Sequence, residues 1–389
     1  MFYNVIMEQL EKLKILSENM DVDEESPPSI HNNCEIVKNS NQYPDVTYAK
    51  MPGGGTIPLL KTMVSSICEK NCNYCAFRSG RDIRRATFSP DELADTFLTM
   101  VNKKIVKGLF LSSGILGKGI FSQDRIIATA EILRVKKKFQ GYLHLKVMPG
   151  AEKDQIKELM KYADRVSINL EAPNPERLST LAPKKDFFTE IFTRLKWMYE
   201  IKSEEVSNGV WKNRWPSIST QFVVGPANED DRELIQSTAY LFDNFKLARV
   251  YFMAFSPVLN TPFENISPEN PIREHRLYQA SYLLRDYKFQ ATEFFFDSSG
   301  KLALESDPKT IWANEKLLNS PYEINTASFH DLLRIPGIGP KRAALIISYR
   351  KRNRIKTLGD LSRLGISCAT SGNYILIDGK KSAKQLKLF

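Results

Sequence analysis

Residues 61–75 read KTMVSSICEKNCNYC, a strand-like apolar run followed at once by cysteines at positions 68, 72 and 75. Three thiolates this close in sequence can each hold one iron of a [4Fe-4S] cluster, and the fourth iron then has no local protein ligand. An open coordination position is where a metal site performs chemistry. The spacing therefore predicts a reactive iron–sulfur site directly after a strand.

Two other interpretations of Cys68, Cys72 and Cys75 stay open at this point. A structural zinc site needs a fourth Cys or His at short spacing, and the next histidine along the chain is His144. An electron-transfer cluster would take a distant fourth ligand, and the remaining cysteines, Cys34 and Cys368, are isolated. Clustered cysteines without a disulfide framework favour a reducing compartment, so we expect a cytoplasmic protein.

Apolar strand-like runs alternate with helical patterns from about residue 60 to residue 290. The predicted strands are 61–67, 107–113, 141–148, 164–170, 217–224 and 249–255, and the predicted helices lie near 90–104, 123–137, 152–162, 187–201, 229–244 and 271–287. This series of βα units predicts an α/β fold with a parallel sheet, open or rolled into a barrel. The runs 141–148 and 164–170 have one apolar and one polar face, which favours a barrel with a polar lumen over an open sheet covered on one side.

The positive charge of the chain lies at its C-terminal end. The formal net charge is +10, and residues 331–389, with thirteen basic and three acidic residues, account for all of it. A compact basic segment indicates a polyanionic partner, most often nucleic acid, and a solubilising tail is the alternative. No run of 18 apolar residues exists, so the sequence predicts no membrane span. Glu8 and Glu11 interrupt the N-terminal apolar run, so we expect no secretory signal.

Residues 323–350 read EINTASFHDLLRIPGIGPKRAALIISYR, which predicts a helix from about Thr326 to Ile335, a glycine turn, and a second helix from Pro340. This pattern resembles the helix-hairpin-helix motif of DNA-binding proteins. Its glycines let the backbone approach a phosphate, and Ile338 is expected to plug the space between the helices. The predicted nucleic-acid-binding residues are Gly337, Ile338, Gly339, Lys341, Arg342, Arg350 and Lys351. Residues 356–366 resemble half of a second, degenerate hairpin.

The cysteine stretch resembles the CxxxCxΦC signature of the radical S-adenosylmethionine (SAM) superfamily, with Tyr74 at the aromatic position. The resemblance implies a partial (βα)6 barrel whose three cysteines hold a [4Fe-4S] cluster. SAM would bind the open iron and be cleaved to a 5′-deoxyadenosyl radical that abstracts hydrogen from a substrate. It further implies cofactor contacts at Tyr74, Ser112, Ser113, Gly114, Asn169, Glu171, Gln221 and Gly225. Ser112-Ser113-Gly114 lacks the acidic residue usual at that turn, so backbone carbonyls would hold the SAM amino group.

Three further features accompany this resemblance. Glu229 follows Gly225 at one residue more than the family's Gly-x-x-Glu spacing. His144 and Lys146 are expected to project into the lumen, toward SAM or the substrate. The basic stretch 78–85, RSGRDIRR, either binds phosphates beside the cysteines or forms a solvated loop.

The barrel motifs and the IPGIGP hairpin together resemble a family of radical SAM proteins assigned to DNA modification or repair and often associated with a uracil-DNA glycosylase homologue. The resemblance covers roughly residues 40–365. It implies DNA as partner, an electron donor such as flavodoxin or ferredoxin, and a uracil-DNA glycosylase-like protein as a further partner. The alternatives are an RNA- or tRNA-modifying radical SAM enzyme, and a DNA-binding protein with a structural or redox-sensing cluster.

The predicted organisation has four parts. Residues 1–56 form an N-terminal helix and loop extension, and residues 57–290 form the partial barrel. Residues 291–322 connect it to a small all-α, basic helix-hairpin-helix module at 323–389.

Overall fold

The computed structural model describes residues 2–17, 46–50 and 55–381. The chain divides into two compact units. The first comprises the described residues up to 229 together with 240–274, and the second comprises residues 230–239 and the described residues from 275 onward. The second unit therefore includes the predicted connector as well as the predicted module.

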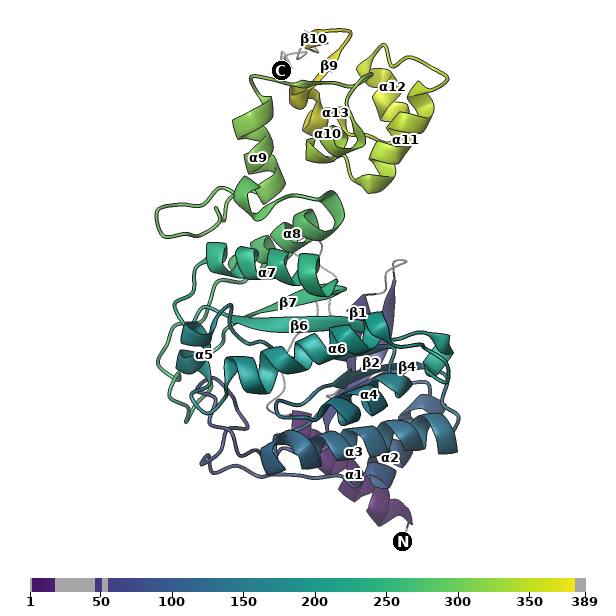
Figure 1. Ribbon diagram of the computed structural model, residues 1–389, viewed down its shortest axis with the longest axis vertical. Helices are drawn as coiled ribbons and strands as arrows, with labels where there is room; N and C mark the ends of the chain where they lie inside the picture. Colours follow the sequence, from purple (N-terminus) through teal and green to yellow (C-terminus); the bar gives the residue numbers. More distant parts are fainter. Residues whose placement is uncertain (1, 18–45, 51–54, 382–389) are drawn as a thin grey trace. The chain divides into compact units, whose positions relative to one another are not determined.

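A curled, half-barrel sheet of seven strands forms the centre of the first unit (Figure 1). The strands lie in sequence order, and β2 to β7 are parallel, whereas β1 pairs antiparallel with β2. Their bounds are β1 Val46–Lys50, β2 Thr56–Met63, β3 Gly108–Ser112, β4 Tyr142–Lys146, β5 Arg165–Ser167, β6 Ser217–Val224 and β7 Arg249–Ala254. The sheet confirms the predicted α/β class and partial barrel.

Helices connect the parallel strands, and α2, α3, α4 and α6 pack side by side along one face of the sheet (Figure 1). The helix bounds are α1 Phe2–Ser17, α2 Pro90–Asn102, α3 Ile120–Glu131, α4 Lys153–Tyr162, α5 Pro175–Leu181, α6 Thr193–Glu204, α7 Asp231–Phe245 and α8 Pro271–Tyr287. Two π-helical segments, Ile132–Lys136 and Phe187–Phe192, and short 3₁₀ turns at Gly117–Gly119, Trp211–Asn213 and Ala291–Glu293 complete this series. Ser89 begins α2, in a capping box with Glu92.

Alternation along the strands separates an apolar face from a polar one. Leu109, Leu111, Leu143 and Leu145 are fully buried. On the opposite face of β4, His144 lies against Phe110 with ring centroids 4.7 Å apart, and its Nε2 shares a 2.8 Å hydrogen bond with Ser167 Oγ of β5. The predicted two-faced pattern is therefore correct, and the polar face forms the inner surface of the half-barrel.

The structure departs from the predicted elements in two places in the first unit. The first parallel strand is Thr56–Met63 rather than 61–67, so the chain leaves the sheet earlier and a longer loop carries the cysteines. Residues 1–56 were expected to form a helix and loop extension, yet Val46–Lys50 within them forms β1, whose backbone pairs antiparallel with β2. Residues 18–45 and 51–54 lie outside the described residues.

The C-terminal part of the second unit contains helices and a small sheet. Its elements are α9 Pro308–Leu317, β8 Tyr322–Glu323, α10 Phe329–Arg334, α11 Pro340–Arg350, α12 Leu358–Arg363, α13 Cys368–Ser371, a 3₁₀ turn Gly372–Tyr374, β9 Ile375–Ile377 and β10 Lys380–Lys381. The three strands pair in the order β10-β9-β8. The module is therefore mainly helical, with a sheet of very short strands that the sequence did not indicate.

Candidate functional site

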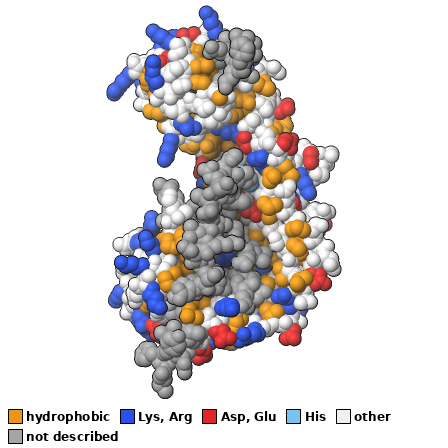
Figure 2. Space-filling model, turned by 180° about the vertical axis from the view of Figure 1, so that it is seen from behind, with side chains coloured by type: hydrophobic (Ala, Val, Ile, Leu, Met, Phe, Trp, Pro, Cys, Tyr) orange, Lys and Arg blue, Asp and Glu red, His pale blue; other side chains and the backbone are white. Residues whose placement is uncertain are grey.

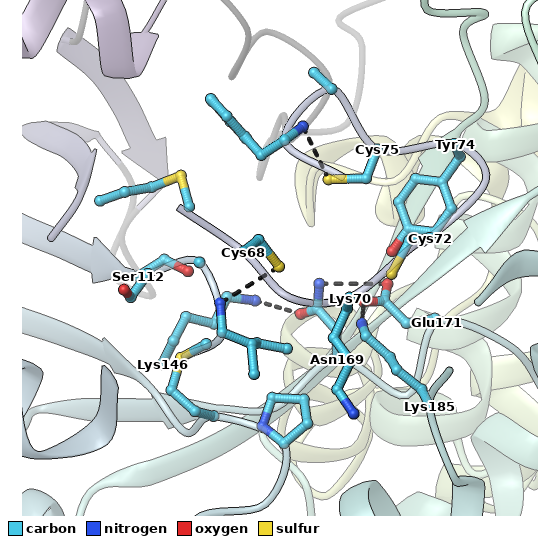
Figure 3. Close-up of a pocket in the computed structure, with 18 of the residues that line it drawn as sticks. Cys68, Lys70, Cys72, Tyr74, Cys75, Ser112, Lys146, Asn169, Glu171 and Lys185 are labelled. Carbon is cyan, nitrogen blue, oxygen red and sulfur yellow. Dashed lines mark hydrogen bonds and ion pairs between the residues drawn. The ribbon is translucent and has the colours of Figure 1, made fainter. Parts of the chain in front are cut away.

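The three clustered cysteines lie in the loop that follows β2, and all three line one cavity of about 170 Å³ (Figure 3). Cys68 Sγ accepts a hydrogen bond from Ile115 N at 3.4 Å, and Cys75 Sγ accepts one from Phe77 N at 3.4 Å. The loop is thus anchored to the chain that follows β3, at the carboxyl end of the sheet. Polar sites of parallel barrels form at this end.

Backbone hydrogen bonds from arginines hold this loop in shape. The three arginines, all from the basic stretch 78–85, are Arg78, Arg81 and Arg85. Arg85 Nη1 donates to Ser66 O at 2.5 Å, and Arg78 Nε donates to Cys72 O at 3.2 Å. Arg81 Nη1 donates to a carbonyl of the same loop at 2.7 Å. These side chains therefore hold the loop together through its carbonyl oxygens. Arg84, by contrast, is exposed and pairs with Glu11.

The three thiols of the cavity match the ligands of an iron–sulfur cluster. Each thiolate of a [4Fe-4S] cluster binds a different iron. Among the described residues, no three Cys, His, Asp or Glu side chains converge on one point. Cys68, Cys72 and Cys75 surround a shared cavity, so the donor set present fits the cluster.

Burial raises the pKa of the Cys72 and Cys75 thiols, while Lys185 lowers it in part. Thiolates at these positions need positive charge beside them, which the iron of a bound cluster would supply together with Lys185. Lys185 Nζ donates to Glu171 Oε1 at 2.9 Å, and both side chains are almost completely buried. Burial also raises the pKa of Tyr74, with a further contribution from Glu171.

Most of the residues predicted to contact SAM line the same cavity. They are Tyr74, Ser112, Ser113, Gly114, Asn169 and Glu171. Two others do not. Gln221 lies behind the cavity wall: it donates to Met253 Sδ at 3.4 Å, and Met253 lines the cavity. Gly225 N donates to Glu229 Oε1, so this pair fixes the turn after β6 rather than the cavity wall.

The turn after β3 has the features of a ligand cradle. A Cβ atom on Gly114 would lie 2.2 Å from Ile67 O, so only glycine fits where the two loops meet. Ser113 Oγ is buried and has no hydrogen-bond partner in the described part of the chain. A buried, unpaired hydroxyl beside the cavity fits a polar ligand such as the amino-acid group of SAM.

Polar side chains from β4 and the end of β5 form the opposite wall. Lys146 Nζ donates to Asn169 Oδ1, and Asn169 Nδ2 lies 3.5 Å from Glu171 Oε2 (Figure 3). Glu171 has a φ of +66°, a strained conformation for a non-glycine residue. Its backbone N–H donates to Gln221 O at 3.0 Å, so β6 fixes the backbone that carries this carboxylate.

Two lysines of the cavity were missed at the sequence level. Besides Lys185, Lys70 lines the cavity and its Nζ pairs with Glu190 Oε1 at 2.7 Å. Lys70 lies between Cys68 and Cys72 in the sequence, and this position was only a weak indication that it belongs to the site. Lys185 lies more than a hundred residues away in a loop with no motif, so only the fold identifies it.

The predicted hairpin is present in the second unit. Ser328 caps α10, Gly337 has a φ of +79° in the turn, and α11 begins at Pro340. The first helix starts slightly later than predicted. Ile338 is fully buried, as expected for a plug between the two helices.

The cations of the hairpin have different roles. Lys341 and Arg342 are exposed, and Arg342 Nη1 donates to Gly337 O at 2.7 Å. Arg350 donates to Ile324 O at 2.9 Å and to another carbonyl, so its guanidinium ties the module together. Lys351 is exposed. Figure 2 shows Lys and Arg side chains projecting from the surface of this module, in the upper part of the view.

A helix that crosses a bilayer must be long and apolar. No helix of the described chain is both long and apolar enough to cross a membrane.

Two family models match this sequence. A model described as the radical SAM superfamily matches residues 62–237, and one described as the helix-hairpin-helix motif matches residues 321–366. The first match contains the cysteine loop and the cavity walls from β3 to β6. The second contains α10, the glycine turn and α11.

Solved structures and curated proteins give partial likenesses. The chain is similar to HydG, a maturase of the [FeFe]-hydrogenase, at TM-score 0.45 and 13% identity over 58% of this chain and 49% of that one. It is also similar to methylornithine synthase (PylB) at TM-score 0.46 and 14% identity, over 59% and 62%. A segment of 44 residues is 50% identical to the kinesin-like protein KIN-10C of Arabidopsis thaliana, 11% of this chain and 6% of that protein. The chain thus spans less than two thirds of each of these proteins.

Proposed function

We propose that this chain is a radical SAM enzyme that acts on DNA, in modification or repair, since its residues 62–237 match the radical SAM superfamily model. The superfamily uses a [4Fe-4S] cluster and SAM. The single observation that supports the proposal most is the shared cavity. It brings the three cysteines together with Ser112 at the end of β3 and with Asn169 and Glu171, which follow β5.

The residues of the cavity have separable roles in this proposal. Cys68, Cys72 and Cys75 would hold the cluster, and Ser113 and Asn169 would orient SAM. When bound, these groups supply reductive cleavage of SAM to a 5′-deoxyadenosyl radical, which removes hydrogen from the substrate. Lys185 Nζ pairs with the Glu171 carboxylate at 2.9 Å, which holds this buried acid in place.

Nucleic acid as the substrate is supported by the second unit. The hairpin match, the exposed Lys341 and Arg342, and the net charge of residues 331–389 are each expected of a phosphate-binding module. DNA is the first candidate because the motif resembles those of DNA-binding proteins, and RNA is the second. A flavodoxin- or ferredoxin-like electron donor, a uracil-DNA glycosylase-like partner and a cytoplasmic location remain part of this proposal.

Cluster content and SAM cleavage test the enzymatic part. We expect anaerobically reconstituted protein to bind four irons and release 5′-deoxyadenosine, and Cys72→Ala to lose both properties. Cys368→Ala is the matched control, because Cys368 lies in α13 outside the cavity. Retained SAM cleavage in Cys72→Ala would overturn the assignment. A full cluster that never cleaves SAM would favour the structural or redox-sensing alternative.

Salt-dependent binding tests the nucleic-acid part. Lys341→Ala and Arg342→Ala should each weaken DNA binding and lower the slope of log K against log salt by about one. Lys316→Ala, an exposed cation on α9, should leave the slope unchanged. Equal slopes for all three variants would contradict the hairpin as the contact. Incubation with DNA and RNA pools, followed by mass spectrometry of the nucleosides, distinguishes the two substrates.

A further inference from the structure

An open groove of about 1190 Å³ lies beside the hairpin, entirely within the second unit. One wall is the C-terminal part of α8, with Tyr282 and Tyr287, and another is the start of α9. The third wall is the glycine turn with the first turn of α11. The α8 and α9 walls lie outside residues 321–366, so the matched motif forms only part of the groove.

The groove carries more available positive charge than negative charge. Arg285 and Asp286 of the groove neutralise each other, which leaves the cations Lys309, Lys341 and Arg342 against one further acid, Asp307. Both carboxylates are engaged locally. Asp286 accepts from Arg285 Nη2 at 2.7 Å, and Asp307 caps α9 by accepting from Thr310 N at 3.0 Å. The groove therefore suits an anion.

Lys309 is the unusual member of this set, because only 8% of it is exposed. Its Nζ donates to Ile338 O at 2.6 Å, directly beneath the glycine turn, and lies 4.7 Å from the centroid of the Tyr287 ring. Tyr287 also approaches the turn closely, since a Cβ on Gly339 would lie 2.9 Å from its Oη. Two helices outside the motif thus pack directly against its turn.

We propose that this groove binds the phosphate backbone of a nucleic-acid strand, and that Lys309 supplies a buried positive charge to a phosphate seated at the glycine turn. The inference rests on the proposed function and adds a binding residue outside the hairpin. An ammonium group in such a site is costly without a counter-charge, and a phosphodiester provides one. Arg342 and Lys341 would meet the same strand from the solvent side.

Proton uptake should accompany this binding. Burial, and to a smaller extent Arg334, lowers the pKa of Lys309 to about 7, against the opposing effect of Asp307. The charged and titratable groups facing Lys309 are Asp307, Arg334 of α10 and Tyr287 of α8. A bound phosphate favours the ammonium form, so affinity is highest below pH 7 and falls as Lys309 loses its proton. Between about pH 6 and 8.5 the loss reaches about 30-fold.

The test measures binding of the full chain to a short fluorescein-labelled DNA duplex, and to one of its strands, by fluorescence anisotropy at fixed salt. Wild-type protein should lose affinity with rising pH, and Lys309→Met should bind weakly with a flat profile. Lys316→Met, on the exposed side of the same helix, should follow the wild type. Thermal unfolding of each variant confirms that it is folded.

Each outcome has a definite meaning. A Lys309→Met variant that retains wild-type affinity and pH slope overturns the inference and leaves the proposed function intact. Should that variant fail to fold, the wild-type profile decides alone, because a flat profile also overturns the inference. Wild-type protein that binds neither DNA form at any pH contradicts the proposed function itself.

Discussion

Gly114→Ala is expected to impair the cluster site while leaving all three cysteines in place. Gly114 lies in the turn after β3, and its N–H donates to Ser65 O at 2.6 Å. A Cβ added there would lie 2.2 Å from Ile67 O and 2.8 Å from Ile67 C. Ile67 immediately precedes Cys68, so any displacement reaches a predicted iron ligand.

The size of the effect follows from these distances. Real Cβ atoms essentially never approach within 3.0 Å of such atoms, so the two backbone segments must separate by about 1 Å. Overpacking of this kind costs about 1–3 kcal/mol, and a metal site tolerates only about 0.5 Å of displacement. We therefore expect incomplete iron loading and SAM affinity weaker by about 5- to 150-fold.

Iron analysis and calorimetric SAM titration of anaerobically reconstituted protein measure both effects. Gly80→Asn is the matched control, since Gly80 belongs to the same cysteine-bearing loop and a Cβ there meets nothing within 4 Å. Asparagine tolerates its φ of +80°. Wild-type iron content and SAM affinity in Gly114→Ala would refute the argument from close approach.

Three further predictions concern other contacts. Arg134→Met breaks a buried 2.9 Å ion pair with Asp164, so the free energy of urea unfolding should fall by about 3–5 kcal/mol; a loss below about 1 kcal/mol would contradict this. Lys185→Met leaves Glu171 buried without its cation and should cost a similar amount, most of which Glu171→Gln in the same chain should restore. Arg350→Ala should destabilise the module by about 1–3 kcal/mol in thermal unfolding without changing the salt slope of DNA binding. A slope lowered by about one would instead make Arg350 a phosphate contact.

The local patterns of the barrel could be predicted from the sequence, because successive side chains of a strand point to opposite faces of the sheet. Leu143 and Leu145 alternate with His144 and Lys146, and this alternation identified both the buried face of β4 and its lumen face. The spacing of the cysteines identified the functional loop that follows β2. Each of these signals lies within a few neighbouring residues.

Features that depend on contacts between residues far apart in the sequence could not be predicted. Lys185 reaches Glu171 only after several elements have packed, and nothing in its neighbourhood marks it. Lys309 looks like an ordinary surface lysine near the start of a helix, yet its Nζ ends beneath a turn 29 residues later. The sheet β8–β10 has strands of two or three residues, too short to produce a periodic pattern.

The hydrogen bonds from arginines to the cysteine loop affect how the protein responds to oxygen. Small metalloproteins that fold around their ion collapse when it is removed, because the ion is their core. Here Arg78, Arg81 and Arg85 secure the loop through carbonyl oxygens, and none of these bonds involves a sulfur atom. Oxidative loss of the iron would then abolish activity but leave the cysteine loop folded. The cluster could be reassembled in the same site.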